Sequence, residues 1–332
     1  MKKVVWGVLS CAKIGREKVI PAMQAASLCD VHAIASRSLA RAQQTADALG
    51  IAVAYGSYEE LLADPAIEAI YNPLPNDQHV PLTLQAARAG KHVLCEKPLA
   101  LDANQAAQLR EVATRVHIME AFMVRFHPQW HHVRERVRSG ELGAVRSIQT
   151  WFSYYNRQTD NIRNHVDQGG GALYDIGCYA IVTARYLFEC EPRRVIALID
   201  RDPQFGTDRT ISALLDFGAG HRLVFTASTQ SVPYQRVQII GERQRIEVRI
   251  PFNAPPDKGT DVLTDDGSAL DGSGIRTETM ATCDQYGLQG DAFARAIRTQ
   301  TPLPWGVDDA VANMRVIDAL FASEKTGAWV VL

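Results

Sequence analysis

Short apolar, β-branched runs alternate with helical segments in the first third of the chain, and this alternation restricts the fold more than any other feature. The clearest runs are Val4–Leu9 and Val31–Ala35, and helical stretches such as Leu39–Leu49 and His79–Ala89 separate successive runs. Strands and helices that alternate at this spacing are typical of a parallel sheet with right-handed crossovers. The sequence therefore predicts an α/β domain over residues 1–121.

The pattern changes after residue 121, where strand candidates follow one another with turn signals between them. Such spacing is typical of a largely antiparallel sheet. We expect Pro251–Cys283, which is polar and rich in Pro, Gly and Asp, to be a long loop, and two helices to close the chain. The predicted class is therefore α/β plus α+β, with a second domain over 122–332. The strand candidates are Val145–Tyr155, Arg194–Ile199, Arg209–Phe217, His221–Thr229, Gln235–Ile240 and Gln244–Ile250, and the helices are Leu288–Thr299 and Asp308–Lys325.

Composition excludes several functional classes. The formal net charge of −2 gives no basic excess for nucleic acid or an anionic membrane, and no apolar stretch is long enough to cross a bilayer. The six cysteines form no CxxC pair and show no metal-ligand spacing. We therefore expect reduced thiols, no metal site and a cytoplasmic location.

The turn after the first strand is the first candidate site. A dinucleotide fingerprint has glycine at positions 10, 12 and 15, and here Ser10 and Ala12 replace two of them. Small residues still allow the backbone to approach a pyrophosphate, and the following helix presents free N–H groups. We predict a dinucleotide here; the alternative is a helix N-terminus without a ligand. The cofactor-binding residues of this turn would be Ser10, Cys11, Ala12, Lys13 and Ile14.

The second strand ends in Ser36-Arg37-Ser38, about twenty residues after the first turn. An acidic residue at this place would bind an adenosine ribose 2′-hydroxyl, but none is present. A planar cation between two hydroxyls suits a 2′-phosphate, so we predict NADP, with NAD possible. The alternative is a solvated arginine at a strand end.

Two further strands end in polar loops. The loop after Ile67–Tyr71 contains Leu74, Pro75, Asn76 and His79, and we expect it beside the nicotinamide ribose, although turn chemistry alone would explain its prolines.

A strand-like run ends in Glu96-Lys97-Pro98. A lysine here is well placed to face a ligand, because ligands in open α/β sheets lie at the carboxyl ends of the strands. The alternative is a surface lysine.

The segment Gly169–Tyr179 is the last candidate. Three successive glycines allow another body to approach the backbone closely. Asp175 and Tyr179 lie four residues apart, so on a helix they share one face. The alternative is an aspartate that complements the helix dipole, with a core tyrosine below it.

Together these motifs resemble those of the Gfo/Idh/MocA oxidoreductases, and the similarity runs nearly end to end. Residues 120–128 are similar to the family's domain junction, and 308–327 to its closing helix. The branch that is most similar contains dimeric dihydrodiol dehydrogenase and the NADP-dependent xylose and glucose dehydrogenases. There are two departures, the thinned glycine fingerprint and Tyr179, which stands where inositol dehydrogenases have histidine.

The resemblance implies hydride transfer between NADP(H) and a sugar-like substrate. Tyr179 would exchange a proton with the substrate oxygen, and the Lys97 ammonium would lower the pKa of its phenol from about 10. Lys97 could itself be the proton donor. Asp175 would orient Lys97 or the substrate, Arg163 would contact the nicotinamide or a substrate hydroxyl, and Glu96 would lie at the cofactor.

The resemblance also implies a homodimer or homotetramer that forms through the C-terminal sheet, with Trp151–Tyr155 and Gln235–Ile240 as candidate contacts. Three other functions stay open: an NAD-dependent glycosidase of the same superfamily, a dinucleotide-sensing regulator, and a structural partner protein. The substrate stays open among aldoses, inososes, anhydrosugars and trans-dihydrodiols.

Overall fold

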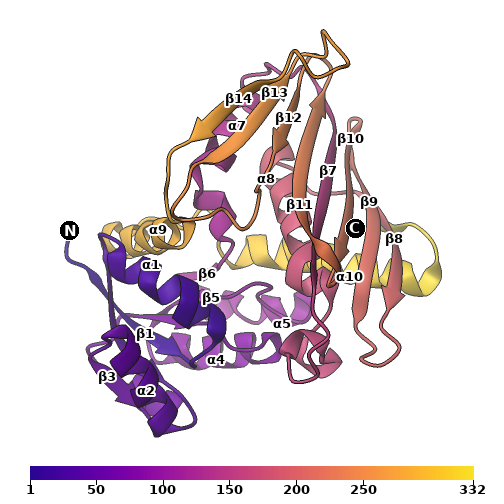
Figure 1. Ribbon diagram of the computed structural model, residues 1–332. Coiled ribbons are helices and arrows are strands. Elements are labelled where there is room, and N and C mark those ends of the chain that lie inside the picture. Colours follow the sequence, from indigo (N-terminus) through magenta and orange to yellow (C-terminus); the bar gives the residue numbers. More distant parts are fainter. The chain divides into compact units, whose positions relative to one another are not determined.

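The computed structural model describes residues 1–332 and contains two sheets, one in each of two compact units (Figure 1). Unit 1 comprises residues 1–123 and 285–314, and unit 2 comprises residues 124–284 and 315–332. From the sequence we placed all of 122–332 in the second domain, whereas the structure places 285–314 in the first unit.

Unit 1 is built on a six-stranded sheet in which all strands are parallel, in the order β3-β2-β1-β4-β5-β6. This is the strand order of a Rossmann domain, and the predicted fold class is confirmed. The strands are β1 Val4–Leu9, β2 Cys29–Ala35, β3 Val53–Tyr55, β4 Ala69–Asn72, β5 His92–Cys95 and β6 Ile118–Glu120. The helices are η1 Gly15–Val19, α1 Ile20–Ala25, α2 Leu39–Leu49, α3 Tyr58–Ala63, α4 Asn76–Arg88, α5 Ala103–Ala107, α6 Arg110–Ala113 and α9 Gln285–Thr299, and α10 Val307–Thr326 begins in this unit.

Successive side chains of β1 explain why helices cover both faces of this sheet. Trp6 is fully buried, and its ring centroid lies 5.5 Å from that of Phe293 in α9. The next residue is Gly7, where a Cβ would lie 2.6 Å from Leu61 Cδ2 in α3. Neighbouring residues of a strand point to opposite faces, so Trp6 fills the gap beneath α9 while Gly7 allows α3 to approach.

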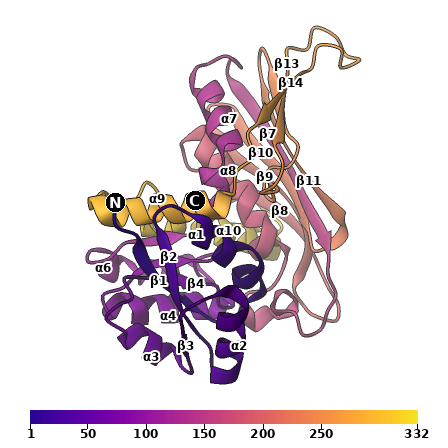
Figure 2. The same ribbon diagram turned by 60° about the vertical axis from the view of Figure 1, so that its left-hand side comes forward.

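Unit 2 is built on a nine-stranded sheet in the order β14-β13-β12-β11-β7-β10-β9-β8-β15. All neighbouring strands are antiparallel except β7 and β10. Helices α7 and α8 lie on one face of the sheet (Figure 2). The strands are β7 Val145–Tyr155, β8 Arg194–Arg201, β9 Asp208–Gly218, β10 His221–Ser228, β11 Gln230–Gly241, β12 Arg245–Val248, β13 Thr260–Asp265, β14 Arg276–Met280 and β15 Val330–Val331. The helices are α7 Pro128–Arg138, η3 Ile162–Asn164, η4 Val166–Gln168, η5 Leu173–Gly177 and α8 Cys178–Phe188.

The prediction of a long loop over Pro251–Cys283 is wrong, because this segment contains the hairpin of β13 and β14. β13 pairs with β12, so its backbone hydrogen bonds come from a neighbouring strand of the sheet. This pairing stabilises a strand whose own polar sequence has a low preference for β structure. Of the residues of β13, Thr260, Thr264 and Asp265 are buried despite their polarity. The high Asp, Gly and Pro content of the segment concealed two strands that tertiary pairing stabilises.

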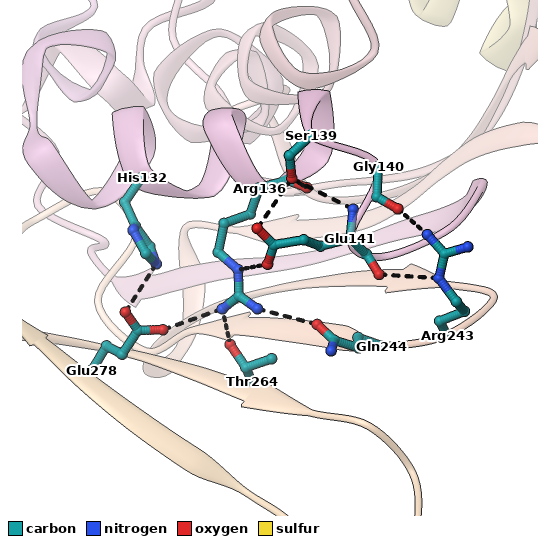
Figure 3. A network of polar contacts seen from close by, with 9 residues as sticks. All are labelled: His132, Arg136, Ser139, Gly140, Glu141, Arg243, Gln244, Thr264 and Glu278. Carbon is teal, nitrogen blue, oxygen red and sulfur yellow. Dashed lines mark hydrogen bonds and ion pairs between the residues drawn. The ribbon is translucent and has the colours of Figure 1, made fainter.

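Arg136 joins helix α7 to this hairpin (Figure 3). Its guanidinium donates to Glu141 Oε2 at 2.9 Å, Thr264 Oγ1 at 2.5 Å, Glu278 Oε1 at 3.2 Å and Gln244 Oε1 at 3.1 Å. The side chain is only 14% exposed, so these partners replace the water that a buried guanidinium loses. The network therefore fixes a strongly polar helix against the edge of the sheet.

One half-buried histidine, His92, and one buried histidine, His127, predict acid sensitivity. His92 Nδ1 accepts from His117 N at 2.9 Å, and His127 Nδ1 accepts from Gln129 N at 3.1 Å at the start of α7. Burial first, and then the charge of a neighbouring histidine, lowers the pKa of each to about 4. Because the pKa of each histidine is lower in the folded than in the unfolded protein, the neutral imidazoles favour the folded state. Their contribution to the free energy of unfolding is present above about pH 6.5 and is lost as the pH falls toward 4.

We expect the two protonations to cost on the order of 2 kcal/mol each, and thermal unfolding between pH 7.5 and 4.5 measures the loss. In His127→Asn the amide can still cap the helix but does not titrate, so this variant should lose less stability than wild type over that range. An identical loss in the variant would contradict the assignment.

The structure bears on two further features of the sequence. No helix combines the length and apolar character that a bilayer crossing requires. All six cysteines carry free thiols, and Cys11, Cys95 and Cys178 within the motifs are buried.

Candidate active site

The predicted cofactor residues of unit 1 follow the carboxyl ends of four neighbouring parallel strands, β2, β1, β4 and β5. In the loop after β1, Ser10 has a positive φ of 76°. Glycine adopts this conformation without strain, and the dinucleotide fingerprint has glycine at this position. Its amide donates to Ala35 O at 2.8 Å, whereas its buried Oγ has no partner within the protein. An unsatisfied buried hydroxyl is rare in proteins, and a bound ligand would explain it. The loop therefore fits a dinucleotide.

Two arginines follow β2, Arg37 directly after the strand and Arg41 in the first turn of α2. Arg37 is exposed, Ser36 is buried, and Ser38 Oγ accepts from Arg41 N at 3.4 Å at the start of α2. Neither Arg37 nor Arg41 forms an ion pair, although both lie close enough to Tyr58 to lower its pKa against the larger effect of burial. Two guanidinium groups without a carboxylate partner fit a phosphate at this strand end. Arg41 is a residue that the sequence analysis missed.

The turn after β5 is fixed from beneath by a buried tyrosine. The Tyr71 hydroxyl donates to Glu96 Oε1 at 2.7 Å, and the Lys97 amide donates to Glu96 Oε2 at 3.3 Å. Burial, and after it the Glu96 charge, raises the pKa of Tyr71 well above its ordinary value, so this hydroxyl remains a donor. The backbone that carries Lys97 is thus held by a carboxylate whose own position is fixed.

His79 joins this turn to the loop after β4. Its Nδ1 lies 2.7 Å from Pro98 O, and its Nε2 lies 2.7 Å from Leu74 O. The side chain is 1% exposed, and burial lowers its pKa to about 4. His79 therefore contacts the backbone of both loops, while Leu74 is itself buried and Pro75 and Asn76 are half-buried.

In unit 2, the glycine segment before Asp175 packs against its own chain. A Cβ on Gly170 would lie 2.5 Å from Arg163 O, and a Cβ on Gly171 would lie 1.9 Å from Asp208 Oδ1. The close approach predicted from the glycines is therefore made by residues of the same unit. The helix that follows opens with the π-helical turn η5, a feature that is frequent at functional sites.

Asp175 is held by two donors from different elements. Tyr154 of β7 donates its hydroxyl to Asp175 Oδ2 at 2.5 Å, and Arg163 of η3 donates Nε to the same oxygen at 2.8 Å. The Asp175 side chain is 13% exposed and that of Arg163 is 40% exposed. Burial, followed by the Asp175 charge, raises the pKa of Tyr154 well above its ordinary value, so the phenol stays protonated. The two donors therefore hold the Asp175 carboxyl group in one orientation.

Tyr179 lies in the first turn of α8, with aromatic rings on two sides. Its centroid lies 5.9 Å from that of Phe152, edge to face, and 5.3 Å from that of Phe252. The side chain is 5% exposed, which restricts the phenol to a narrow range of orientations.

Lys97 belongs to unit 1, whereas Asp175, Tyr179 and Arg163 belong to unit 2.

The structure adds Tyr154 to the predicted residues, and the sequence contains a signal for it. In Trp151–Tyr155 the period of two places Phe152 and Tyr154 on one face of the strand and Trp151 and Tyr155 on the other. From the sequence, the whole of Trp151–Tyr155 is assigned to an oligomer contact. Only Trp151 and Tyr155 are exposed, at 44% and 64%.

Comparisons with known proteins agree with this architecture. Residues 4–125 match the oxidoreductase family with an NAD-binding Rossmann fold, and residues 130–247 match the GFO/IDH/MocA C-terminal domain. The chain is 45% identical to an uncharacterized oxidoreductase of Rhizobium meliloti, over 99% of each chain. It is 41% identical to D-xylose 1-dehydrogenase (NADP(+)) 2 of Haloferax volcanii, over 99% of this chain and 100% of that one.

Among solved structures, a 3-ketoreductase from Actinomadura kijaniata in complex with NADP and TDP-benzene superposes with a TM-score of 0.90 at 29% identity. The similarity covers 97% of this chain and 98% of that chain. Full-length identity above 40% and matches to both family domains together lead to one conclusion: the protein belongs to the Gfo/Idh/MocA family of oxidoreductases.

Proposed function

We propose that this protein is an NADP(H)-dependent oxidoreductase that transfers hydride between the nicotinamide and a carbohydrate or a related polyol or dihydrodiol. The observation that carries the proposal is the 41% identity, over nearly the whole of both chains, to an NADP-dependent D-xylose dehydrogenase. The two unpaired guanidinium groups at the end of β2 support the choice of NADP over NAD.

NADP(H), when bound, would accept or supply the hydride. The loop of Ser10, Cys11, Ala12, Lys13 and Ile14 would bind the pyrophosphate, and Ser36, Arg37 and Ser38 would bind the 2′-phosphate together with Arg41. Leu74, Pro75, Asn76 and Glu96 would line the nicotinamide side. His79 is buried against two backbone carbonyls, so its contribution would be to fix the loops of Leu74 and Pro98.

The proposed proton relay uses Lys97 and Tyr179. A substrate hydroxyl must lose a proton when its carbon loses a hydride, and Tyr179 or Lys97 would take that proton at the substrate oxygen. Asp175, held by Tyr154 and Arg163, would present a fixed carboxylate to orient Lys97 or a substrate hydroxyl. Arg163, whose Nε donates to Asp175, would contact the substrate or the nicotinamide.

A substrate panel tests this function. Aldoses, anhydrosugars and trans-dihydrodiols are incubated with NADP⁺ and with NAD⁺, inososes, which carry a ketone, are incubated with NADPH and with NADH, and the absorbance of reduced nicotinamide is followed. We expect net reduction of NADP⁺, or net oxidation of NADPH, with at least one member of the panel. Hydrolysis of a glycoside without net reduction would replace the proposal with a glycosidase, and cofactor binding without turnover on the whole panel would point to a regulator.

We also propose a homodimer or homotetramer that forms through the face of the nine-stranded sheet opposite α7 and α8. Apolar side chains are exposed on three strands, at Trp151 (44%), Val224 (44%) and Tyr234 (47%). Sedimentation equilibrium is expected to give the mass of two or four chains, and a single-chain mass at micromolar concentration would contradict the proposal.

A cytoplasmic location also stays a proposal, which cell fractionation would test.

A further inference from the structure

Asp208, at the start of β9, is a fully buried carboxylate that contacts the segment in front of Asp175. Its side chain is 1% exposed, and Oδ2 accepts from Leu173 N at 2.6 Å. Only glycine fits at position 171, because its φ is +119° and a Cβ there would lie 1.9 Å from Asp208 Oδ1. The sequence between Gly171 and Leu173 is therefore shaped around one carboxyl group.

The backbone carbonyl of Arg163 also contacts this glycine segment. Gly171 N donates to Arg163 O at 2.9 Å, and Gly170 N donates to His165 O at 2.8 Å. The Arg163 side chain then reaches Asp175 Oδ2 at 2.8 Å. Asp208, the glycines, Arg163 and Asp175 thus form one closed chain of contacts, in which a shift at Asp208 moves the turn that carries Asp175.

We propose that Asp208 is a positioning residue for the proposed reaction: its carboxylate holds the amino-terminal turn of the helix that carries Asp175 and Tyr179. This inference rests on the proposed function. Asp208 contacts neither substrate nor cofactor in this role. It acts by fixing Leu173 N, two residues before Asp175 and within the π-helical turn that leads into α8.

The charges around Asp208 give the proposal a second readout. Burial raises the pKa of Asp208 to about 7, Arg201 of β8 lowers it, and Glu324 of α10 raises it. Tyr154 of β7 also lies within electrostatic range. Above about pH 7 the carboxylate is ionised and accepts a charge-assisted bond from Leu173 N, and below that pH the bond weakens. Turnover should therefore rise with pH around neutrality.

Asp208→Asn tests the inference, with Asp202→Asn as a matched control. Asp202 is also 1% exposed and accepts from Gln204 N and Phe205 N, but it does not touch the glycine segment. We expect Asp208→Asn to lower kcat about 10- to 100-fold, to leave the Kd for NADPH within about twofold, and to abolish the rise in kcat near pH 7. Asp202→Asn should lower Tm yet keep both kcat and that rise.

Glu324→Gln supplies an independent check if Asp208→Asn does not fold. Glu324 is paired with Arg201, and its charge raises the pKa of Asp208, so the variant should shift the rise in kcat to lower pH. Wild-type kcat with an unchanged pH profile in Asp208→Asn, or an unshifted profile in Glu324→Gln, would overturn the inference. Absence of turnover in the wild-type protein over the whole panel would instead reject the proposed function.

Discussion

Lys97→Met is expected to reduce kcat about 10²- to 10⁴-fold, the range that a positioned acid–base group contributes, while the Kd for NADPH changes by less than about threefold. Methionine retains much of the length of the lysine side chain but has no ammonium. The variant therefore removes the group that would polarise the substrate oxygen and lower the pKa of Tyr179. The backbone at this turn should persist, because Tyr71 and the Lys97 amide hold Glu96 independently of the ammonium.

Lys91→Met is the matched control for this experiment, since it lies before β5 where Lys97 lies after it. The Lys91 ammonium donates to Asp64 O at 2.7 Å and to Ile67 O at 2.8 Å, which are contacts of a purely structural kind. We expect this variant to lower Tm and to leave kcat within a few-fold of wild type. Equal turnover in Lys97→Met and wild type, in steady-state assays with the best substrate of the panel, would remove Lys97 from the mechanism.

Arg37→Ala is expected to raise the KM for NADP⁺ about 10- to 100-fold and to change the KM for NAD⁺ little. A hydrogen bond to a charged group contributes about 1.5–3 kcal/mol, which corresponds to that range of affinity. Because Arg41 also lacks a carboxylate partner, the double variant with Arg41→Ala should lose more NADP⁺ affinity than either single variant. The measurement is the ratio of kcat/KM for the two cofactors.

Arg110→Ala controls for the loss of an exposed arginine in the same unit. Arg110 pairs with Asp308 at 2.8 Å, and its side chain is 48% exposed, so its removal should alter neither KM. If Arg37→Ala kept the wild-type ratio of NADP⁺ to NAD⁺ efficiency, the 2′-phosphate would have to bind elsewhere.

Elements with strong local patterns were predictable from the sequence. Val4–Leu9, Leu39–Leu49 and Val145–Tyr155 have the same bounds in the structure as in the sequence analysis. Helix α7 was not predicted, because Trp130 and Val133 are its only buried apolar side chains, and the Arg136 network joins it to the edge of the sheet. Its stability depends on partners more than one hundred residues away in the sequence.

The residues of the candidate site likewise include some that local motifs identified and some that they did not. Motifs at strand ends identified Lys97 and Arg37 as residues of interest, because polar groups at such ends have few structural reasons to be there, and the glycine segment before a helix identified Asp175. Asp208 gave no local signal, since it contacts Leu173 across 35 residues and only the path of β9 brings them together. Residues that position others are specified by topology, which a linear pattern does not display.

The return of residues 285–314 to the first unit has a consequence for biosynthesis. Arg298 reaches back to Glu68 at 2.6 Å, and Phe293 covers Trp6, so the Rossmann unit is incomplete until its last segment has left the ribosome. The amino-terminal strands and helices, although made first, therefore cannot complete their unit until residues 285–314 have been made, and the nascent chain must carry an uncovered tryptophan through most of translation.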